Sequence, residues 1–85
     1  MVLVETSKFK KLRKKIKEEL EKEALKEAVL KILDNPLAWK KLKGEFKDLH
    51  SLTYTVKGQN RRLIYKLEKE RIVLFSFGPR QGIYK

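Results

Sequence analysis

The sequence predicts a small α+β domain in which a helical hairpin packs on a mainly antiparallel four-stranded sheet. Two observations favour this class. Apolar residues recur at steps of three and four through residues 9–33, as in an amphipathic helix, and short β-prone runs fill residues 52–77. The predicted order of elements is β-α-α-β-β-β, and the 85 residues fit a single domain that spans residues 1–85.

A short strand and a helical region come first. Val2-Leu3-Val4 is a β-prone run, and Thr6 or Ser7 can cap the helix that follows. The apolar stripe of the helical region comprises Phe9, Leu12, Ile16, Leu20, Ala24, Leu25, Ala28, Val29, Ile32 and Leu33. Asp34-Asn35-Pro36 is a strong helix terminator.

The helical region is predicted to bend. One straight helix over residues 7–34 would be about 40 Å long at the usual rise per residue, and much of its apolar stripe would stay uncovered in so small a domain. A hairpin broken near residues 17–19 buries the stripe better, and we favour it, although the periodicity alone allows either arrangement. Residues 37–42 are expected to form a short helical turn around Trp39, which Gly44 ends.

The last third of the chain predicts three strands. Residues 52–56 alternate apolar side chains with threonine, which is typical of a half-buried strand. Residues 57–60 form a hairpin turn, residues 61–67 the next strand, and residues 68–70 a second turn. The alternation along residues 61–67 puts Leu63, Tyr65 and Leu67 on one face and Arg62, Ile64 and Lys66 on the other. Residues 72–77 are almost wholly apolar, as in an interior strand that is buried on both faces.

The charge of the chain indicates a polyanionic partner. Its 22 Lys and Arg against 11 Asp and Glu give a formal net charge of +11, and the imbalance is greater in the last third. Nucleic acid, a ribosome, an anionic membrane or an acidic protein would fit this charge. The absence of cysteine excludes disulfides and thiolate metal sites, and a single histidine disfavours zinc. No apolar stretch suits a signal peptide or a membrane span, so we expect a cytoplasmic protein.

Four short motifs follow one another along the chain. They are Asn35-Pro36 after the helical region, Leu42-Lys43-Gly44, Arg62-Leu63-Ile64-Tyr65 on the middle strand, and Gly78-Pro79-Arg80 with Tyr84 after the last strand. Their order and spacing, in a chain of this size and charge, resemble the RelE/ParE superfamily of bacterial and archaeal toxins. The resemblance covers residues 2–85, nearly the whole chain, and implies the small RelE-like fold.

The resemblance implies a toxin of a type II toxin–antitoxin system that cuts messenger RNA at the ribosome. The ribose 2′-OH would attack the adjacent phosphodiester without a metal, because cationic side chains stabilise the phosphorane. By motif, Arg62 and Arg80 would hold the phosphate, and Tyr84 would stack on the nucleotide or transfer a proton. RelE-type proteins usually offer lysines where this chain has Thr53 and Thr55.

The general base is therefore left open. His50 and Lys57 flank the strand that carries the two threonines, and His50 is the only side chain whose unperturbed pKa lies near neutrality. Lys57, Arg61, Lys43 and Lys47 are candidate RNA contacts.

The implied partners are a cognate acidic antitoxin, the ribosome and mRNA, with no membrane and no cofactor. Two alternatives stay open. The lost strand lysines favour a ParE-type inhibitor of DNA gyrase without nuclease activity, and a catalytically degenerate toxin would act only as a binding module.

Overall fold

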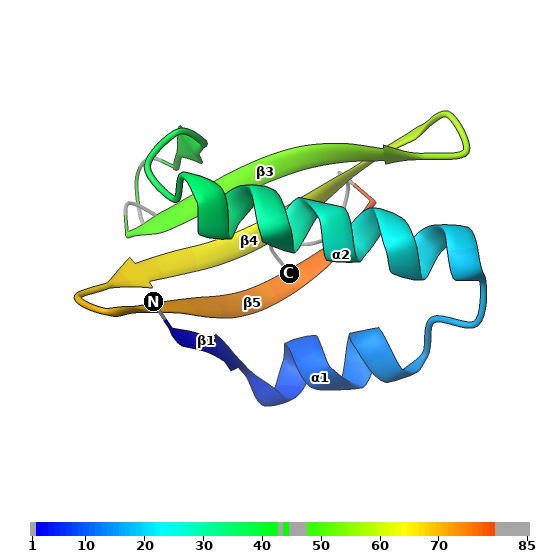
Figure 1. The fold of residues 1–85 in the computed structure, drawn as a ribbon, viewed down its shortest axis with the longest axis horizontal. Helices are drawn as coiled ribbons and strands as arrows, with labels where there is room; N and C mark the ends of the chain where they lie inside the picture. The colour runs from blue at the N-terminus through cyan, green and yellow to red at the C-terminus, as the bar shows by residue number, and fades with distance from the viewer. Residues whose placement is uncertain (1, 43, 45–47, 80–85) are drawn as a thin grey trace.

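The computed structural model of the protein describes residues 2–42, 44 and 48–79. The elements are β1 (Val2–Glu5), α1 (Ser7–Lys14), α2 (Glu19–Asp34), β2 (Lys40–Lys41), β3 (Leu49–Val56), β4 (Gln59–Glu68) and β5 (Arg71–Pro79) (Figure 1). They form one five-stranded sheet in the order β1-β5-β4-β3-β2. Among the described strands, β1 and β5 alone pair in parallel, and the other pairs are antiparallel. The predicted α+β class is confirmed, with five strands in place of four.

The helical region is a hairpin, as favoured above. α1 ends at Lys14, where the N–H groups of Lys15 and Ile16 turn back to carbonyls three residues earlier. α2 starts at Glu19 after an extended Glu18 (ψ 134°). The two helices run in opposite directions over one face of the sheet (Figure 1). Each helix can therefore turn its own part of the apolar stripe toward the strands, which one straight helix could not do.

Thr6 fixes the start of α1. Its hydroxyl oxygen accepts a hydrogen bond from the N–H of Phe9 at 3.2 Å, and the hydroxyl group donates to the carbonyl of Leu74 at 3.0 Å. The predicted cap is thus confirmed, and it also ties the helix to β5. Phe9 is 1% exposed and meets Phe77 edge to face, with ring centroids 5.1 Å apart. Burial of one such aromatic side chain contributes about 1.5–3 kcal/mol.

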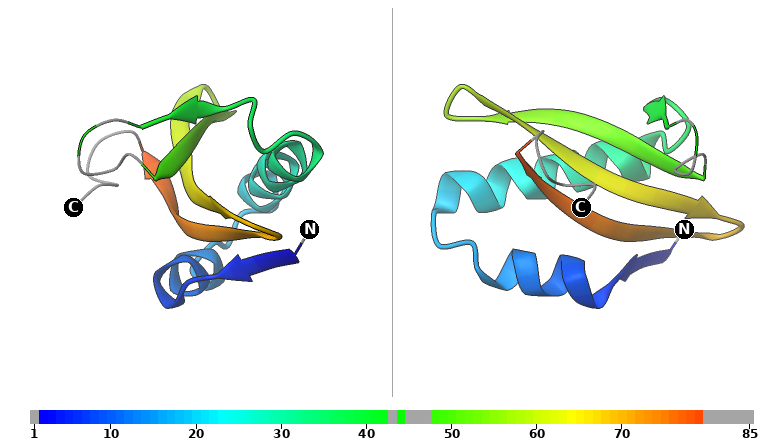
Figure 2. Two further views of the ribbon diagram at one scale, coloured as in Figure 1. Left: turned by 90° about the vertical axis from the view of Figure 1, so that its left-hand side faces the viewer. Right: turned by 180° about the vertical axis from the view of Figure 1, so that it is seen from behind.

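The core lies between the helices and one face of the sheet. It comprises Phe9, Ile16, Leu25, Ala28 and Ile32 from the helical region and Leu52, Tyr54, Val56, Leu63, Tyr65, Ile72, Leu74 and Phe77 from the strands. α1 packs on β5 and β1, and α2 packs on β3. In the part of the chain that the structure describes, no helix covers the opposite face of the sheet (Figure 2). We call that second face the open face.

The expected helical turn at residues 37–42 is wrong. These residues turn after Pro36 and then extend into β2, which pairs with β3 through Lys40 opposite Ser51 and Lys41 opposite His50. Two hydrogen bonds hold the connection: Tyr65 Oη of β4 donates to the Pro36 carbonyl at 2.6 Å, and Trp39 Nε1 donates to the Lys31 carbonyl of α2 at 3.4 Å. Pairing with the edge of β3 also satisfies backbone groups that a single helical turn would leave exposed.

The turn between β3 and β4 is shorter than predicted. Lys57 (φ 51°) and Gly58 (φ 80°) alone occupy it, and the next two residues already belong to β4. Two residues with positive φ match the tight hairpin turn whose twist agrees with that of the strands. The turn after β4 is likewise shorter than predicted, because Glu68 still pairs with Arg71 in the ladder.

Candidate functional site

Arg62 stands on the open face of the sheet. Along β4, Leu63 and Tyr65 point into the core beneath the helices, so Arg62 points the other way, as the alternation predicted. Its partners in the neighbouring strands are Thr53 on β3 and Gly78 on β5. A threonine and a glycine thus flank this half-buried arginine, so neither neighbouring strand places a large or charged side chain directly beside it.

The backbone conformation at residue 78 favours glycine. Its φ of 151° lies in a region that favours glycine. The strand ends one residue later at Pro79, and Arg80 follows directly in the sequence. Arg80, Tyr84, Lys43 and Lys47 lie outside the described residues, so their predicted roles stay predictions.

The described open face suits anion binding more than proton transfer. Its polar side chains beside Arg62 include Thr53, Thr55 and Asn60, with the Thr55 hydroxyl donating to Asn60 Oδ1 at 3.3 Å. Hydroxyl and amide groups donate hydrogen bonds but do not titrate near neutrality. An arginine stays charged and matches two phosphate oxygens with its planar fork. These side chains can therefore help to hold a phosphate, whereas none of Thr53, Thr55 and Asn60 can remove a proton near neutrality.

His50 lies on the opposite side of the sheet from Arg62. It shares its face with the core residue Leu52 and stacks on Tyr65, with ring centroids 5.2 Å apart. Burial, and secondly the charge of Lys41, lower its pKa. Its Nδ1 is buried and makes no hydrogen bond within the described chain. The structure thus does not bring His50 together with Arg62.

Lys57 and Arg61 are held by acidic residues at the start of α2. Lys57 pairs with Glu18, and Arg61 Nη1 lies 2.5 Å from Glu21 Oε1 with both side chains about one fifth exposed. Arg61 therefore faces the helices, although its sequence neighbour Arg62 faces the open side. Burial raises the pKa of the nearby Tyr54 hydroxyl to about 12, so this group stays neutral.

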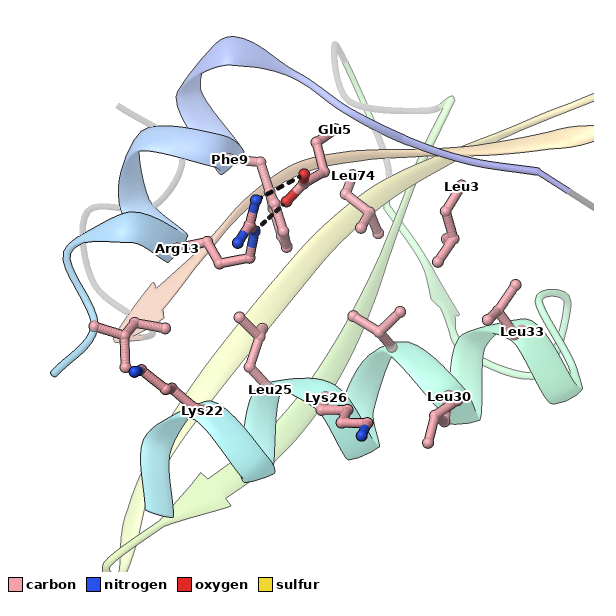
Figure 3. Close-up of a pocket in the computed structure, with 12 residues that line it drawn as sticks. Leu3, Glu5, Phe9, Arg13, Lys22, Leu25, Lys26, Leu30, Leu33 and Leu74 are labelled. Atoms are coloured by element: carbon pink, nitrogen blue, oxygen red, sulfur yellow. Dashed lines mark hydrogen bonds and ion pairs between the residues drawn. The ribbon is translucent and has the colours of Figure 1, made fainter. Parts of the chain in front are cut away.

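A second candidate site lies on the helical side. A groove of about 600 Å³ runs between α1 and α2 above β5 (Figure 3). Its apolar lining consists of Leu3, Phe9, Ile16, Leu25, Val29, Leu30, Leu33 and Leu74. Its polar lining consists of Glu5, Arg13, Lys22 and Lys26. The predicted stripe supplies most of the apolar lining, but periodicity gave no sign that the helices would stand apart and leave a groove.

One ion pair lies along the α1 side of the groove (Figure 3). Arg13 Nε lies 2.5 Å from Glu5 Oε2, and Arg13 Nη2 lies 3.1 Å from Glu5 Oε1, which makes the pair bidentate (Figure 3). The Arg13 hydrogen bond is the main cause that lowers the pKa of the Glu5 carboxyl. Sequence reasoning missed this pair. Glu5 ends a strand and Arg13 lies eight residues later in a helix, so their separation along the chain does not fix the distance between their side chains. Because Arg13 and Glu5 neutralise each other, Lys22 and Lys26 supply the net positive charge along the rim of the groove.

Two further kinds of site were sought in the described ranges. No three His, Asp or Glu side chains of residues 2–42, 44 and 48–79 come together as metal ligands. Neither of the described helices is long and apolar enough to cross a membrane.

Comparisons with known proteins agree with the fold. Over residues 3–85 the sequence matches the family of ParE-like toxins of type II bacterial toxin–antitoxin systems. Similar solved structures include a chain of the E. coli RelBE toxin–antitoxin complex, with a TM-score of 0.74 and 18% identity over 94% of this chain and 96% of that chain. The isolated E. coli RelE toxin gives 0.72 and 24% identity over 98% and 89% of the two chains. No curated protein matches significantly in sequence.

Proposed function

The chain belongs to the ParE-like toxins of type II bacterial toxin–antitoxin systems, within the superfamily that its motifs resemble, and we propose that it is a ribosome-dependent endoribonuclease that cleaves mRNA. One observation carries the nuclease proposal: Arg62 stands on the open face between Thr53 and Gly78. Neither neighbouring strand places a large or charged side chain opposite it. Inhibition of translation in the cytoplasm would follow from the cleavage.

The proposed reaction uses charge rather than a metal. The ribose 2′-OH attacks the adjacent phosphorus, a cyclic phosphate forms, and the bond to the 5′-oxygen breaks with a proton passing to that oxygen. Arg62 and Arg80 would stabilise the phosphorane, since preorganised cations act where negative charge develops. Tyr84 would stack on the nucleotide or carry a proton.

The position of His50 argues against its use as the base at this phosphate. The sheet separates its ring from Arg62. Among the residues proposed from sequence, Tyr84 remains for proton transfer, and Lys43 and Lys47 remain for RNA contact. Lys57 and Arg61 would contact RNA only after they release Glu18 and Glu21.

We propose the groove between the helices as the site of the acidic antitoxin. Its apolar lining suits one face of an amphipathic helix, and Lys22 and Lys26 on its rim suit acidic residues beside that face. Such a segment can order only on binding, which fits a partly disordered partner. Because the groove and Arg62 lie on opposite sides of the sheet, a segment confined to the groove would not cover the phosphate site.

The test of nuclease activity is primer extension on an mRNA in a translating extract. We expect discrete cuts within codons that require ribosomes and disappear with Arg62→Ala and with Arg80→Ala. Arg71→Ala is the matched control, because it removes an exposed arginine of β5 that pairs with Glu68. An intact message with normal translation would refute the nuclease.

A second function is favoured by Thr53 and Thr55, which place hydroxyls on the open face beside Arg62. A ParE-type toxin would inhibit DNA gyrase by binding and would need no general base. A gyrase supercoiling assay with and without the protein separates the two proposals. Binding to ribosomes with neither cleavage nor gyrase inhibition would indicate a degenerate toxin that acts as a binding module.

A further inference from the structure

α1 carries an unusually dense set of cations on its solvent side. We define the lysine face of α1 as Lys10, Lys11, Lys14, Lys15 and Lys17. All five side chains belong to exposed residues of the helix or of the connection that follows it. The first turn of α1 contains no acidic residue. The face therefore presents five positive charges over little more than two helical turns.

These charges are not neutralised by ion pairs within the described chain. Arg13, on the same helix, pairs with Glu5, and the β3–β4 hairpin pairs Lys57 and Arg61 with acidic residues of α2. No ion pair of residues 2–42, 44 and 48–79 involves a lysine of this face. The cations that sequence suggested for RNA binding at the hairpin thus form ion pairs. Those of the lysine face form none in these ranges, although Lys10 and Lys14 lie near enough to Glu5 to help lower the pKa of its carboxyl.

The surroundings of the lysine face disfavour a lipid surface. A helix that binds a membrane interface inserts an apolar face beside its basic one. In α1 the apolar residues face the sheet instead, with Phe9 only 1% exposed and Leu12 packed against the core. The exposed large apolar side chains of the described residues lie elsewhere, at Val2, Leu3, Leu20, Leu30 and Leu37.

The lysine face is also separate from the two sites already described. α1 contributes Phe9 and Arg13 to the groove, and Ile16 follows from the connection, but no lysine of the face lines it. Arg62 lies on the far side of the sheet from the helices. The lysine face is therefore a separate surface that can recognise a partner only by its negative charge. A row of backbone phosphates has that chemistry.

We propose that the lysine face of α1 binds the phosphate backbone of nucleic acid without reading the bases. On the ribosome, this surface would dock ribosomal RNA while Arg62 meets the message. In that respect the inference rests on the proposed function. Its test measures binding and not cleavage, so a failure of RNA binding can be told apart from a failure of the nuclease. Lysine suits such a role, because a flexible ammonium group meets a phosphate as a point charge.

The test measures the affinity of the full chain for a short RNA duplex, and for a DNA duplex of the same sequence, by fluorescence anisotropy over a range of salt concentrations. The variant is Lys11→Gln/Lys14→Gln/Lys15→Gln. Its control, Lys31→Gln/Lys41→Gln/Lys69→Gln, lowers the formal net charge of +11 by the same three units at exposed residues outside the lysine face. We expect the variant to bind about tenfold or more weakly at low salt and to lose about one unit of salt slope per lysine.

Three outcomes would overturn the proposal. Unchanged affinity and salt slope in the α1 variant would exclude the surface, and equal losses in variant and control would indicate net charge alone. Lysine-dependent binding to phosphatidylserine vesicles, with no duplex binding, would identify a membrane surface instead. Lys11→Arg/Lys14→Arg/Lys15→Arg should keep the affinity, and circular dichroism should show that all variants fold. Equal affinity for the RNA and DNA duplexes would support recognition of the backbone. So would a preference for one duplex, provided that the affinity still falls in the α1 variant.

Discussion

Arg61 and Arg62 are adjacent in the sequence, yet β4 turns them to opposite faces of the sheet. Arg61 meets Glu21 of α2, and Arg62 lies between Thr53 and Gly78. The first is thus placed to stabilise the fold and the second to bind a ligand. The type of residue is identical, so only its position in the pleat separates the two roles.

The two arginines should separate stability from activity. Arg61→Ala leaves Glu21 partly buried without its partner, which we expect to cost about 1–3 kcal/mol in the free energy of unfolding. Arg62→Ala should remove RNA cleavage. Urea unfolding and primer extension on both variants measure the two effects. If Arg61→Ala abolished cleavage while its unfolding midpoint stayed at the wild-type value, this division of roles would be wrong.

His50 makes stability depend on pH. Burial and Lys41 lower its pKa in the folded state below the ordinary 6.5, so the unfolded chain takes up a proton first as the pH falls. We expect the free energy of unfolding to decrease as pH falls below about 6.5 and to level off below the folded-state pKa. His50→Phe keeps a ring against Tyr65 and should flatten this part of the profile. A wild-type urea midpoint that is constant from neutral to mildly acidic pH would contradict it.

At the scale of elements, the β3–β4 hairpin depends on its two-residue turn. The turn needs positive φ at Lys57 and Gly58, and a Cβ at Gly58 would meet no atom within 4 Å. Gly58→Ala would therefore destabilise the fold only through the backbone conformation. We expect the free energy of unfolding to fall by about 1–2 kcal/mol. Thermal unfolding followed by circular dichroism measures it. Gln59→Ala, one position along at an exposed site, serves as the control and should change the melting temperature little.

The helices and strands also show which sequence signals were sufficient to predict local structure. The Thr6 cap, the alternation along β3 and β4, and the terminator at residues 34–36 are local, so they predicted the corresponding structure. β2 depends instead on contacts of Tyr65 with Pro36 and of Lys40 with Ser51, which join distant parts of the chain. A segment of six residues has no local preference strong enough to show that pairing, and the predicted helical turn failed there.

At the scale of the whole molecule, the sheet separates the groove from the phosphate-binding face. Leu30 lines the groove and is 53% exposed, whereas Leu37 is 73% exposed and lies outside it. Because a charge on Leu30 would have to be buried against an apolar partner, we expect Leu30→Glu to weaken binding of the cognate antitoxin at least about tenfold. Leu37→Glu should leave it unchanged. Calorimetric titration gives the affinities, and equal losses in both variants would exclude the groove.

The same pair of variants tests the separation of the two sites. Both should keep the ribosome-dependent cleavage of the wild type, since neither residue lies on the open face. Loss of cleavage in Leu30→Glu, with folding intact, would show that the two sides of the sheet are coupled.

The sequence by itself determined the α+β class, the faces of the strands and the family, because each rests on local periodicity or motif order. It also singled out Arg62. It favoured the helical hairpin over one straight helix, but only the structure decided between them. Tertiary structure alone decided that His50 and Arg61 face the helices, that Glu18 and Glu21 occupy the hairpin cations, and that a groove opens between α1 and α2. Those facts depend on how elements far apart in the chain meet, and pairing across such distances leaves no mark in a local pattern.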